Sequence, residues 1–284
     1  MQRIIGFFIV FGCVVLGYLE AKGNLGALWQ PAELIIIVGA AMGAMVVAHP
    51  VAVLKGIGGQ LKTLLGKGYT QDYYRAIIEL MFELLETVRK DGIKKLDEHI
   101  ENPDSSALFA KYPSITASPV LLAFITDNLR LMAMGKMSPH DLEALLETEI
   151  HTIQNDLLRP SKALAKTGEA MPGFGIVAAV LGIVVTMQNI GGNLALIGAK
   201  VAAALVGTFI GVLLSYGVFD PLSAAMGNLV KKEVMGLKMV MAILVAQQQG
   251  RPTLLALDAG RKLLISEYKP SFFEMERWLT AEQN

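Results

Sequence analysis

The distribution of charged side chains divides the chain into apolar windows separated by polar segments. Residues 4–19 and 34–54 contain no Asp, Glu, Lys or Arg, and residues 170–219 contain only Lys200. A helix needs about 20 apolar residues to cross the hydrocarbon core of a bilayer. The first two windows therefore predict one transmembrane helix each, and the third, which is more than twice as long, predicts two.

The two helices of the third window are predicted to meet at residues 188–193, where paired glycines and side-chain amides favour a tight turn. Lys200 then lies one or two turns inside the fourth helix, where its aliphatic stem lets the ammonium group reach the membrane surface. A cleaved signal peptide explains the first window less well, because no small-residue cleavage site follows it.

The polar segments carry apolar residues at helical spacing. One helix is predicted over residues 70–89 and stops at Gly92, and another begins at Pro139 after the N-cap Ser138. Two further helices are predicted near the C-terminus, over residues 221–249 and 253–267. Because no useful length of sequence alternates as a strand does, the predicted fold class is all-α, a polytopic membrane protein with four transmembrane helices and a helical cytoplasmic domain.

Positive charge is distributed unevenly between the two ends of the predicted spans. Of the 25 Lys and Arg residues, all but Lys22 and Lys200 precede the first span, separate the second from the third, or follow the fourth. An excess of Lys and Arg marks the cytoplasmic side, so both termini are predicted to be cytoplasmic. The predicted domains are a transmembrane hairpin (1–54), a cytoplasmic helical domain (55–169), a second transmembrane hairpin (170–220) and cytoplasmic C-terminal helices (221–284).

The composition agrees with a membrane protein and argues against several other classes. Hydrophobic residues make up 53% of the 284 residues, and the mean hydropathy is +0.49. The formal net charge is zero, so no overall basic field attracts nucleic acid. Cys13 is the single cysteine, the four histidines are scattered, and no phosphate-binding loop or metal-binding motif is present. We therefore expect no enzyme activity, no metal site and no cofactor.

Small residues recur along one face of each of the last two predicted spans. They are Gly175, Ala179, Gly182 and Thr186 on the third span, and Ala204, Gly207, Thr208, Gly211 and Ser215 on the fourth. Such faces let helix backbones approach closely, either within one chain or between chains. Pro172 and Pro221 are predicted to open the third span and to close the fourth, where a helix can bend.

Acidic residues are missing from the middle of every predicted span, and Glu33 stands at the outer edge of the second. A pathway for protons or cations through hydrocarbon normally needs an ionisable side chain inside the bilayer. If the chain conducts ions, a partner must therefore supply the acid.

Several short segments, spread over nearly the full length, form a specific set. They are residues 25–34 (LGALWQPAEL), 100–103 (IENP), 171–180 (MPGFGIVAAV), 206–209 (VGTF) with 221–222 (PL), 260–262 (GRK) and 269–272 (KPSF). Together they resemble the MotA branch of the MotA/TolQ/ExbB family, the stator subunits of the bacterial flagellar motor in the inner membrane. TolQ and ExbB relatives typically have three spans, so the predicted four spans favour the MotA branch.

The resemblance implies a pentameric ring of this chain around a dimer of MotB, whose transmembrane Asp binds the ion. Ion passage would turn the ring, and the cytoplasmic helices would push on the rotor protein FliG. By the same resemblance, the ion-pathway and coupling residues are Pro172, Ala179, Thr208 and Pro221, and the rotor-contact residues are Arg89, Asp97 and Glu149. Many relatives carry Glu where this chain has Asp97, and the shorter acid keeps the sign but reduces the reach.

Protons are the predicted transported ion. Sodium-driven members of the family tend to carry Thr where this chain has Ala179, whereas Thr208 occurs in both kinds. Sodium needs several oxygen ligands, and a methyl group provides none. The sequence leaves two other functions open, a TolQ/ExbB-like proton-driven force generator and a passive membrane scaffold without ion flow.

Overall fold

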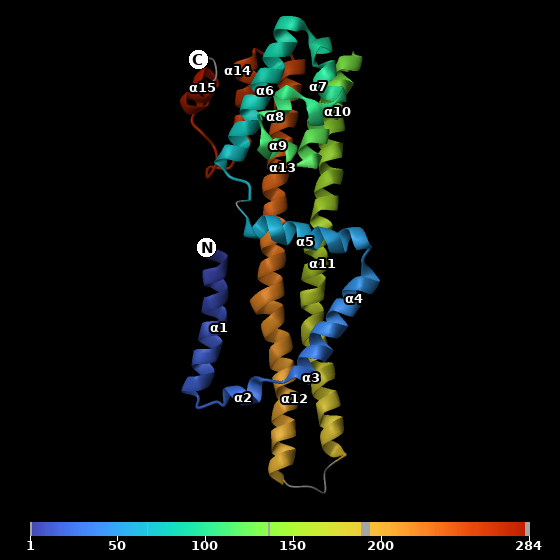
Figure 1. Cartoon of the computed structure of the whole chain (residues 1–284), viewed down its shortest axis with the longest axis vertical. Helices are drawn as coiled ribbons and strands as arrows, with labels where there is room; N and C mark the ends of the chain where they lie inside the picture. The colour runs from blue at the N-terminus through green and yellow to red at the C-terminus, as the bar shows by residue number, and fades with distance from the viewer. Residues whose placement is uncertain (1, 67, 136, 189–193, 282–284) are drawn as a thin grey trace. The chain divides into compact units, whose positions relative to one another are not determined.

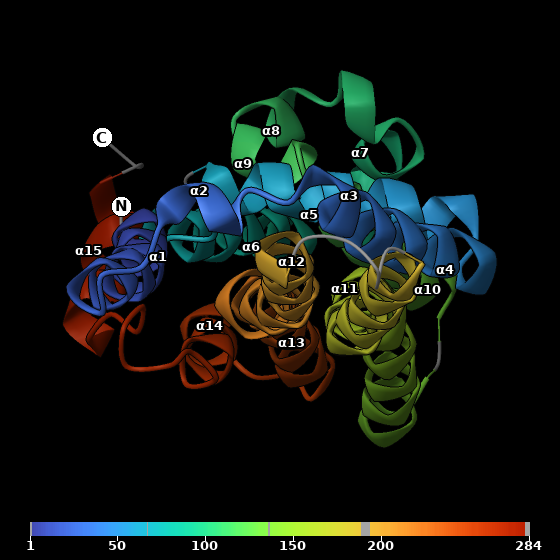
Figure 2. The same ribbon diagram turned by 90° about the horizontal axis from the view of Figure 1, so that it is seen from below.

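The computed structural model describes residues 2–66, 68–135, 137–188 and 194–281 (Figures 1 and 2). Throughout these ranges the regular elements are helices, which confirms the all-α fold class. The turn predicted over residues 188–193 falls on positions 189–193, which lie outside the described residues. The chain divides into two compact units, each built from two stretches of sequence: unit 1 contains Met1–Leu64 and Leu158–Asn228, and unit 2 contains Leu65–Leu157 and Leu229–Asn284.

Unit 1 is made of apolar helices. They are α1 (Gln2–Glu20), α2 (Leu25–Leu28), α3 (Pro31–Leu34), the π-helical turn η1 (Ile35–Gly39), α4 (Ala40–Ala48), α5 (Val51–Leu65), the later part of α11 (Pro139–Met187), α12 (Leu194–Leu214), the π-helical turn η4 (Ser215–Phe219) and the start of α13 (Asp220–Gln248). Among the described residues, three stretches are long and apolar enough to cross a membrane, namely Leu25–Ala48, which joins α2 to α4, Pro139–Met187 and Ile197–Gln248. A shorter apolar helix covers Ile4–Glu20.

The second apolar helix ends earlier than the sequence predicts. α4 stops at Ala48, and His49 has an extended backbone with φ −131° and ψ 141°. The ring of Pro50 disfavours a helical conformation at the residue before it. The helix predicted over residues 34–54 is therefore broken, and α5 starts afresh at Val51.

Pro172 and Pro221 lie inside continuous helices rather than at helix ends, and that they open and close their membrane spans stays a prediction. α11 continues on both sides of Pro172. Pro221 is the second residue of α13, which follows η4 without interruption. In η4 the N–H of Asp220 donates to the carbonyl of Ser215, five residues earlier. This wider turn accommodates the proline ring without ending the helix.

Unit 1 packs around small clusters of buried apolar side chains. One cluster joins α4, α5, α11 and α13 through Met45, Val53, Ile57, Ala163, Leu164 and Met226. A second joins η1 and α4 to α11 through Ile37, Ala41, Met171 and Ala178. Many other large apolar side chains are exposed, including Phe8 at 75% and Val47 at 90%. This distribution is typical of helices whose outer faces contact lipid.

Unit 2 contains α6 and the shorter helices around it. Its elements are α6 (Gln71–Asp91), the 3₁₀ turn η2 (Ile93–Leu96), α7 (Asp97–Glu101), the 3₁₀ turn η3 (Pro103–Ser105), α8 (Ala107–Ala110), α9 (Pro113–Thr116), α10 (Pro119–Met134), the first part of α11, most of α13, α14 (Thr253–Arg261) and α15 (Phe272–Ala281). Figure 1 shows α6 beside α13 and α14. The hydroxyl of Tyr74 on α6 donates to the carbonyl of Lys232 on α13 at 3.0 Å.

Local signals predicted several helix ends in unit 2 correctly. α6 ends at Gly92, whose φ of 82° favours glycine, and α11 begins at Pro139. The Ser138 hydroxyl accepts the backbone N–H of Asp141 at 3.1 Å, as expected of an N-cap. The helix predicted over residues 253–267 is shorter, because α14 ends at Arg261.

Candidate functional site

A row of glycines brings the backbones of α11 and α12 into contact, and Figure 2 shows the two helices side by side. A methyl group on Gly211 would lie 2.7 Å from the carbonyl oxygen of Met171. A methyl group on Gly175 would lie 3.0 Å from the carbonyl oxygen of Gly207. These positions have no room for a side chain, so packing of the predicted small-residue faces within one chain is confirmed. A contact with a helix of another chain stays a prediction.

Three of the four predicted ion-pathway residues lie on this pair of helices. Thr208 is half-buried on α12, and its Cα would lie 3.2 Å from a methyl group on Gly175. Pro172 is half-buried one turn before Gly175, and Ala179 is half-buried one turn after it. Thr208 therefore offers a hydroxyl, whereas Pro172 and Ala179 offer only hydrocarbon.

Pro221 is separated from these three residues. It is exposed and lines an apolar groove of about 230 Å³ with Phe7 and Val10 of α1 and Gly217 of η4. The structure thus places Pro221 on the α1 side of the helix that contains it. An ion-pathway role for Pro221 still rests on the resemblance.

Glu33 is more deeply buried than its place at the edge of the second span indicates. Its side chain is 8% exposed and lies at the seam between α11 and α12. A methyl group on Gly182 would lie 3.6 Å from its Oε1, and one on Gly207 would lie 3.4 Å from its Cγ. The two glycines leave room for the carboxyl group. The sequence shows an acid next to an apolar window, but contacts with helices so distant in the chain have no local signal.

Arg89 forms an ion pair within α6. Its Nη2 lies 2.6 Å from Oε2 of Glu86, one turn earlier, and its side chain is 64% exposed. Lys90 is 3.9 Å from the same oxygen. The Glu86 side chain is 17% exposed and accepts a hydrogen bond at Oε1 from the Thr253 hydroxyl of α14, at 2.8 Å.

Glu86 is charged at neutral pH despite this burial. Burial alone would raise the pKa of Glu86, but hydrogen bonds from Arg89 and Thr253 and the positive charges of Arg89 and Lys90 outweigh it and lower the pKa. The i,i+3 spacing of Glu86 and Arg89 is a readable sequence signal. The contribution of Thr253 has no such signal, and sequence reasoning missed it.

The other two predicted rotor-contact residues lie apart from this pair. Asp97 is exposed at the first position of α7, and no ion pair involving its carboxylate is found among the described residues. Glu149 is half-buried on α11, and its Oε2 accepts a hydrogen bond at 3.0 Å from Nδ2 of Asn128, which is itself 3% exposed. Arg89, Asp97 and Glu149 thus all belong to unit 2, and each has different surroundings.

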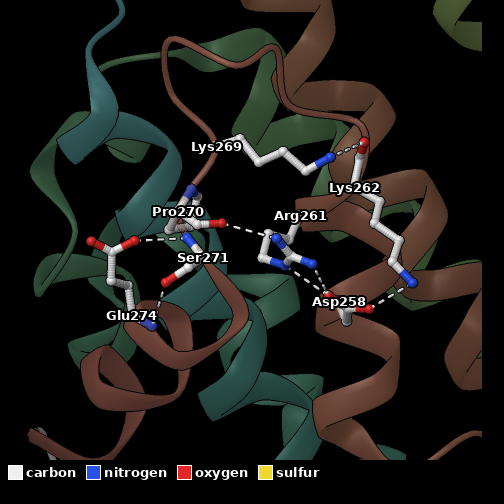
Figure 3. Close-up of polar contacts among 7 residues, drawn as sticks. All are labelled: Asp258, Arg261, Lys262, Lys269, Pro270, Ser271 and Glu274. Atoms are coloured by element: carbon white, nitrogen blue, oxygen red, sulfur yellow. Dashed lines mark hydrogen bonds and ion pairs between the residues drawn. The ribbon is translucent and has the colours of Figure 1, made fainter.

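Two of the segments that carry the family resemblance, residues 260–262 and 269–272, meet in space (Figure 3). Arg261 lies 2.7 Å from Oδ1 of Asp258 through Nη2, and its Nη1 donates to the carbonyl of Pro270 at 2.9 Å. Asp258 also lies 2.9 Å from Lys262. Arg261 thereby joins the end of α14 to the segment that leads to α15. The predicted helix over residues 253–267 instead ends at Arg261.

Ser271 and Glu274 then start α15. The Ser271 N–H donates to the Glu274 carboxylate at 2.7 Å, and the Glu274 N–H donates to the Ser271 hydroxyl at 3.2 Å (Figure 3). This reciprocal arrangement is a capping box. In the part of the chain that the structure describes, no group of three or more His, Cys, Asp or Glu side chains could hold a metal ion.

Two family models match the chain and together cover most of it. The model for the motility protein A N-terminal region matches residues 4–92, and the model for the MotA/TolQ/ExbB proton channel family matches residues 117–239. The first match includes the α6 residues Glu86 and Arg89, and the second includes the α11–α12 seam. A match to the motility protein A model favours the MotA branch over TolQ and ExbB.

Relatives and solved structures are similar over nearly the full length. The chain is 51% identical to the chemotaxis protein LafT of Vibrio parahaemolyticus over 100% of both sequences. It is 38% identical to motility protein A of Salmonella typhimurium, over 100% of this chain and 97% of that protein. Its fold is similar to that in a structure of MotAB from C. jejuni, with a TM-score of 0.74 at 16% sequence identity over 94% of this chain and 96% of that one.

A membrane location agrees with both the family and the three long apolar helices. The family is one of proton channels, and its relatives carry motility names rather than the names of enzymes. This chain belongs to the MotA branch of the MotA/TolQ/ExbB proton channel family, as a multi-pass protein of the inner membrane.

Proposed function

We propose that the chain is a stator subunit of a bacterial flagellar motor and forms a proton channel together with MotB. The observation that carries the proposal is the full-length similarity to LafT and to motility protein A. A solved MotAB stator complex from Bacillus subtilis has a similar fold, with a TM-score of 0.67 over 96% of this chain. That complex supports MotB as the partner.

The apolar residues 170–219 carry no acid that could bind a proton. Residues 170–219 contain no Asp or Glu, and Thr208 is the predicted ion-pathway residue with a polar side chain. A dimer of MotB, surrounded by a pentamer of this chain, supplies the transmembrane Asp in this proposal. The methyl group of Ala179 favours protons over sodium, because sodium needs oxygen ligands.

Torque passes from the cytoplasmic helices to the rotor protein FliG through charged residues. Arg89 and Asp97 are exposed, as a contact surface requires, and Glu149 is half-buried. The asymmetry of Lys and Arg supports a cytoplasmic location for both termini and for this surface.

Motility measurements test the proposal. The chain, expressed with its cognate MotB in a strain that lacks stators, is expected to restore swimming. A protonophore should stop this swimming, and replacement of sodium by potassium should leave it unchanged. A matched control carries Asn in place of the transmembrane Asp of MotB, and it should insert in the membrane without restoring motility.

Two results would contradict different parts of the proposal. A complex that inserts in the membrane and binds MotB but never restores motility would argue against a stator function. Swimming that survives a collapsed proton gradient but stops without sodium would keep the stator function and replace the proton by sodium.

A further inference from the structure

Arg89, the proposed rotor contact, does not extend freely from the end of α6. An exposed arginine can adopt many rotamers, and holding it in one of them costs side-chain entropy. Here the guanidinium is held by Glu86 at 2.6 Å while 64% of the side chain stays exposed. The pair therefore limits the directions in which Arg89 can point without covering it.

Glu86 is itself fixed from a second helix. Its two carboxylate oxygens have separate partners, because Oε2 contacts Arg89 and Oε1 accepts the Thr253 hydroxyl. Thr253 is 8% exposed and is the first residue of α14, so it is a rigid donor. A carboxylate held on one oxygen presents the other in a defined direction.

We propose that Glu86 is a positioning residue for the rotor contact, held by Thr253 and orienting the Arg89 guanidinium toward an acidic group of the partner. This inference rests on the proposed function, in which Arg89 contacts the rotor. One N–H of the guanidinium points to Glu86, and because no further contact of Arg89 is found among the described residues, its remaining N–H groups can bind a partner carboxylate. Glu86 therefore takes part in torque generation without touching the rotor.

The same geometry has a competing interpretation, in which the pair only stabilises the end of α6. The two interpretations differ when the charges are exchanged. The double variant Glu86→Arg with Arg89→Glu keeps an ion pair within the helix but presents a negative charge to the partner. A purely structural pair would tolerate this exchange, whereas a pair that presents Arg89 would not.

Tethered-cell rotation at high load tests the inference, with each variant co-expressed with MotB in a strain that lacks stators. Single exposed charge pairs are weak, about 0.2–1 kcal/mol, so the variants are compared in an Asp97→Asn background, where the contact is already weakened. The variants are Arg89→Ala, Glu86→Gln, Glu86→Asp and the exchanged pair. Asp91→Asn is the matched control, because it removes an exposed acid near the end of α6 that has no ion-pair partner among the described residues.

Glu86→Gln is expected to lower rotation speed by up to about fivefold, which is the most that the loss of one exposed charge pair would cause. Arg89→Ala is expected to have a similar effect. Asp91→Asn should have no effect, and Glu86→Asp should recover part of the speed. The exchanged pair should still insert in the membrane and bind MotB, but it should not recover rotation. Thr253→Val, which keeps the shape of the side chain and removes its hydroxyl, should give a smaller loss than Glu86→Gln.

Failure of this inference is distinguishable from failure of the proposed rotor contact. If Arg89→Ala slows rotation but Glu86→Gln and Thr253→Val do not, Glu86 does not position Arg89. If the exchanged pair rotates normally, the ion pair is only structural and the inference is wrong. If neither Arg89→Ala nor Glu86→Gln has any effect, Arg89 is not a rotor contact, and the inference falls with it.

Discussion

Gly211 lies where the backbones of α11 and α12 meet. A methyl group at this position would be 2.7 Å from the carbonyl oxygen of Met171, a backbone atom that cannot rotate away. Gly211→Ala should therefore push the two helices apart and destabilise unit 1 by about 1–3 kcal/mol, the usual cost of overpacking. The melting temperature of the detergent-solubilised complex measures the effect.

Gly198 provides the matched control on the same helix, because a methyl group there would meet nothing within 4 Å. Gly198→Ala should leave the melting temperature unchanged or raise it slightly, since Ala favours a helix over Gly by up to ~1 kcal/mol. Equal melting temperatures for Gly211→Ala and Gly198→Ala would show that the two helices can separate without cost.

Residue-level contacts were predictable where they depend on spacing along one helix. The recurrence of Gly175 and Gly182 indicated a close-packed face, and the i,i+3 spacing of Glu86 and Arg89 fits the observed ion pair. The hydrogen bond from Thr253 to Glu86 joins residues 167 positions apart. Nothing local to either residue encodes such a contact, because it depends on how α6 and α14 pack.

At the scale of the helix, Pro172 deprives α11 of one backbone hydrogen bond, because proline has no N–H to donate. The α11–α12 seam begins at the adjacent residue, Met171. Pro172→Ala restores the donor without adding bulk, so assembly should survive while the local helix stiffens. We expect complexes that insert in the membrane and bind MotB but do not turn the motor.

Pro160 lies in the same helix and gives a matched control for the loss of a proline. Its ring packs on α5, where a methyl group on Gly56 would be 2.7 Å from its Cγ. Pro160→Ala should keep rotation in tethered cells. Normal rotation with Pro172→Ala would show that this proline has no role in coupling, and loss of MotB binding would show that it acts in assembly.

The junction of α14 and α15 is predicted to weaken in acid. Burial alone would raise the pKa of Asp258, but hydrogen bonds from Lys262 and Arg261 and their positive charges outweigh it and lower the pKa. A carboxyl whose pKa is lowered by folding stabilises the folded state above its unfolded pKa, near ~3.9. This contribution is lost as the pH falls through the folded pKa.

Asp258→Asn tests this junction in melting experiments at different pH. The Arg261 and Asp258 side chains are only 12% and 11% exposed. Loss of one partner should therefore cost roughly 2–3 kcal/mol at pH 7, somewhat below the cost for a fully buried pair. The difference from wild type should begin to narrow below about pH 4, where the unfolded chain starts to bind the proton, and should vanish only below the lower pKa of the folded state. A difference that does not change with pH would show that Asp258 stabilises the fold without its charge.

Helix ends were predictable where a few neighbouring residues determine them. Ser138 and Pro139 start α11, and Gly92 stops α6, as their conformational preferences require. The C-terminal end of α14 was not predictable in this way, because apolar residues continue at helical spacing after Arg261. After that end the chain turns back, and the carbonyl of Pro270 accepts a hydrogen bond from Arg261, a contact that has no signal in the residues next to Arg261.

For the whole molecule, composition and charge-free windows were enough to predict an all-α membrane protein. The grouping of helices into units was not predictable, because each unit combines stretches that are far apart in the sequence. The predicted ion-pathway and rotor-contact residues are likewise divided between the two units. Pro172, Ala179 and Thr208 share one pair of helices in unit 1, whereas Arg89, Asp97 and Glu149 have separate local surroundings in unit 2.

Each unit combines two stretches of the chain, so the ribosome begins unit 2 before it has completed unit 1. Unit 1 can pair its first stretch, Met1–Leu64, with its second only after Leu65–Leu157 has been translated. Unit 2 in turn lacks Leu229–Asn284 until Leu158–Asn228 has been translated. The partners of Tyr74 and Glu86, Lys232 and Thr253, lie in this last stretch. Until that stretch is made, a nascent chain exposes the part of the apolar face of α6 that later packs on α13 and α14, and such transiently exposed apolar surface is prone to aggregation.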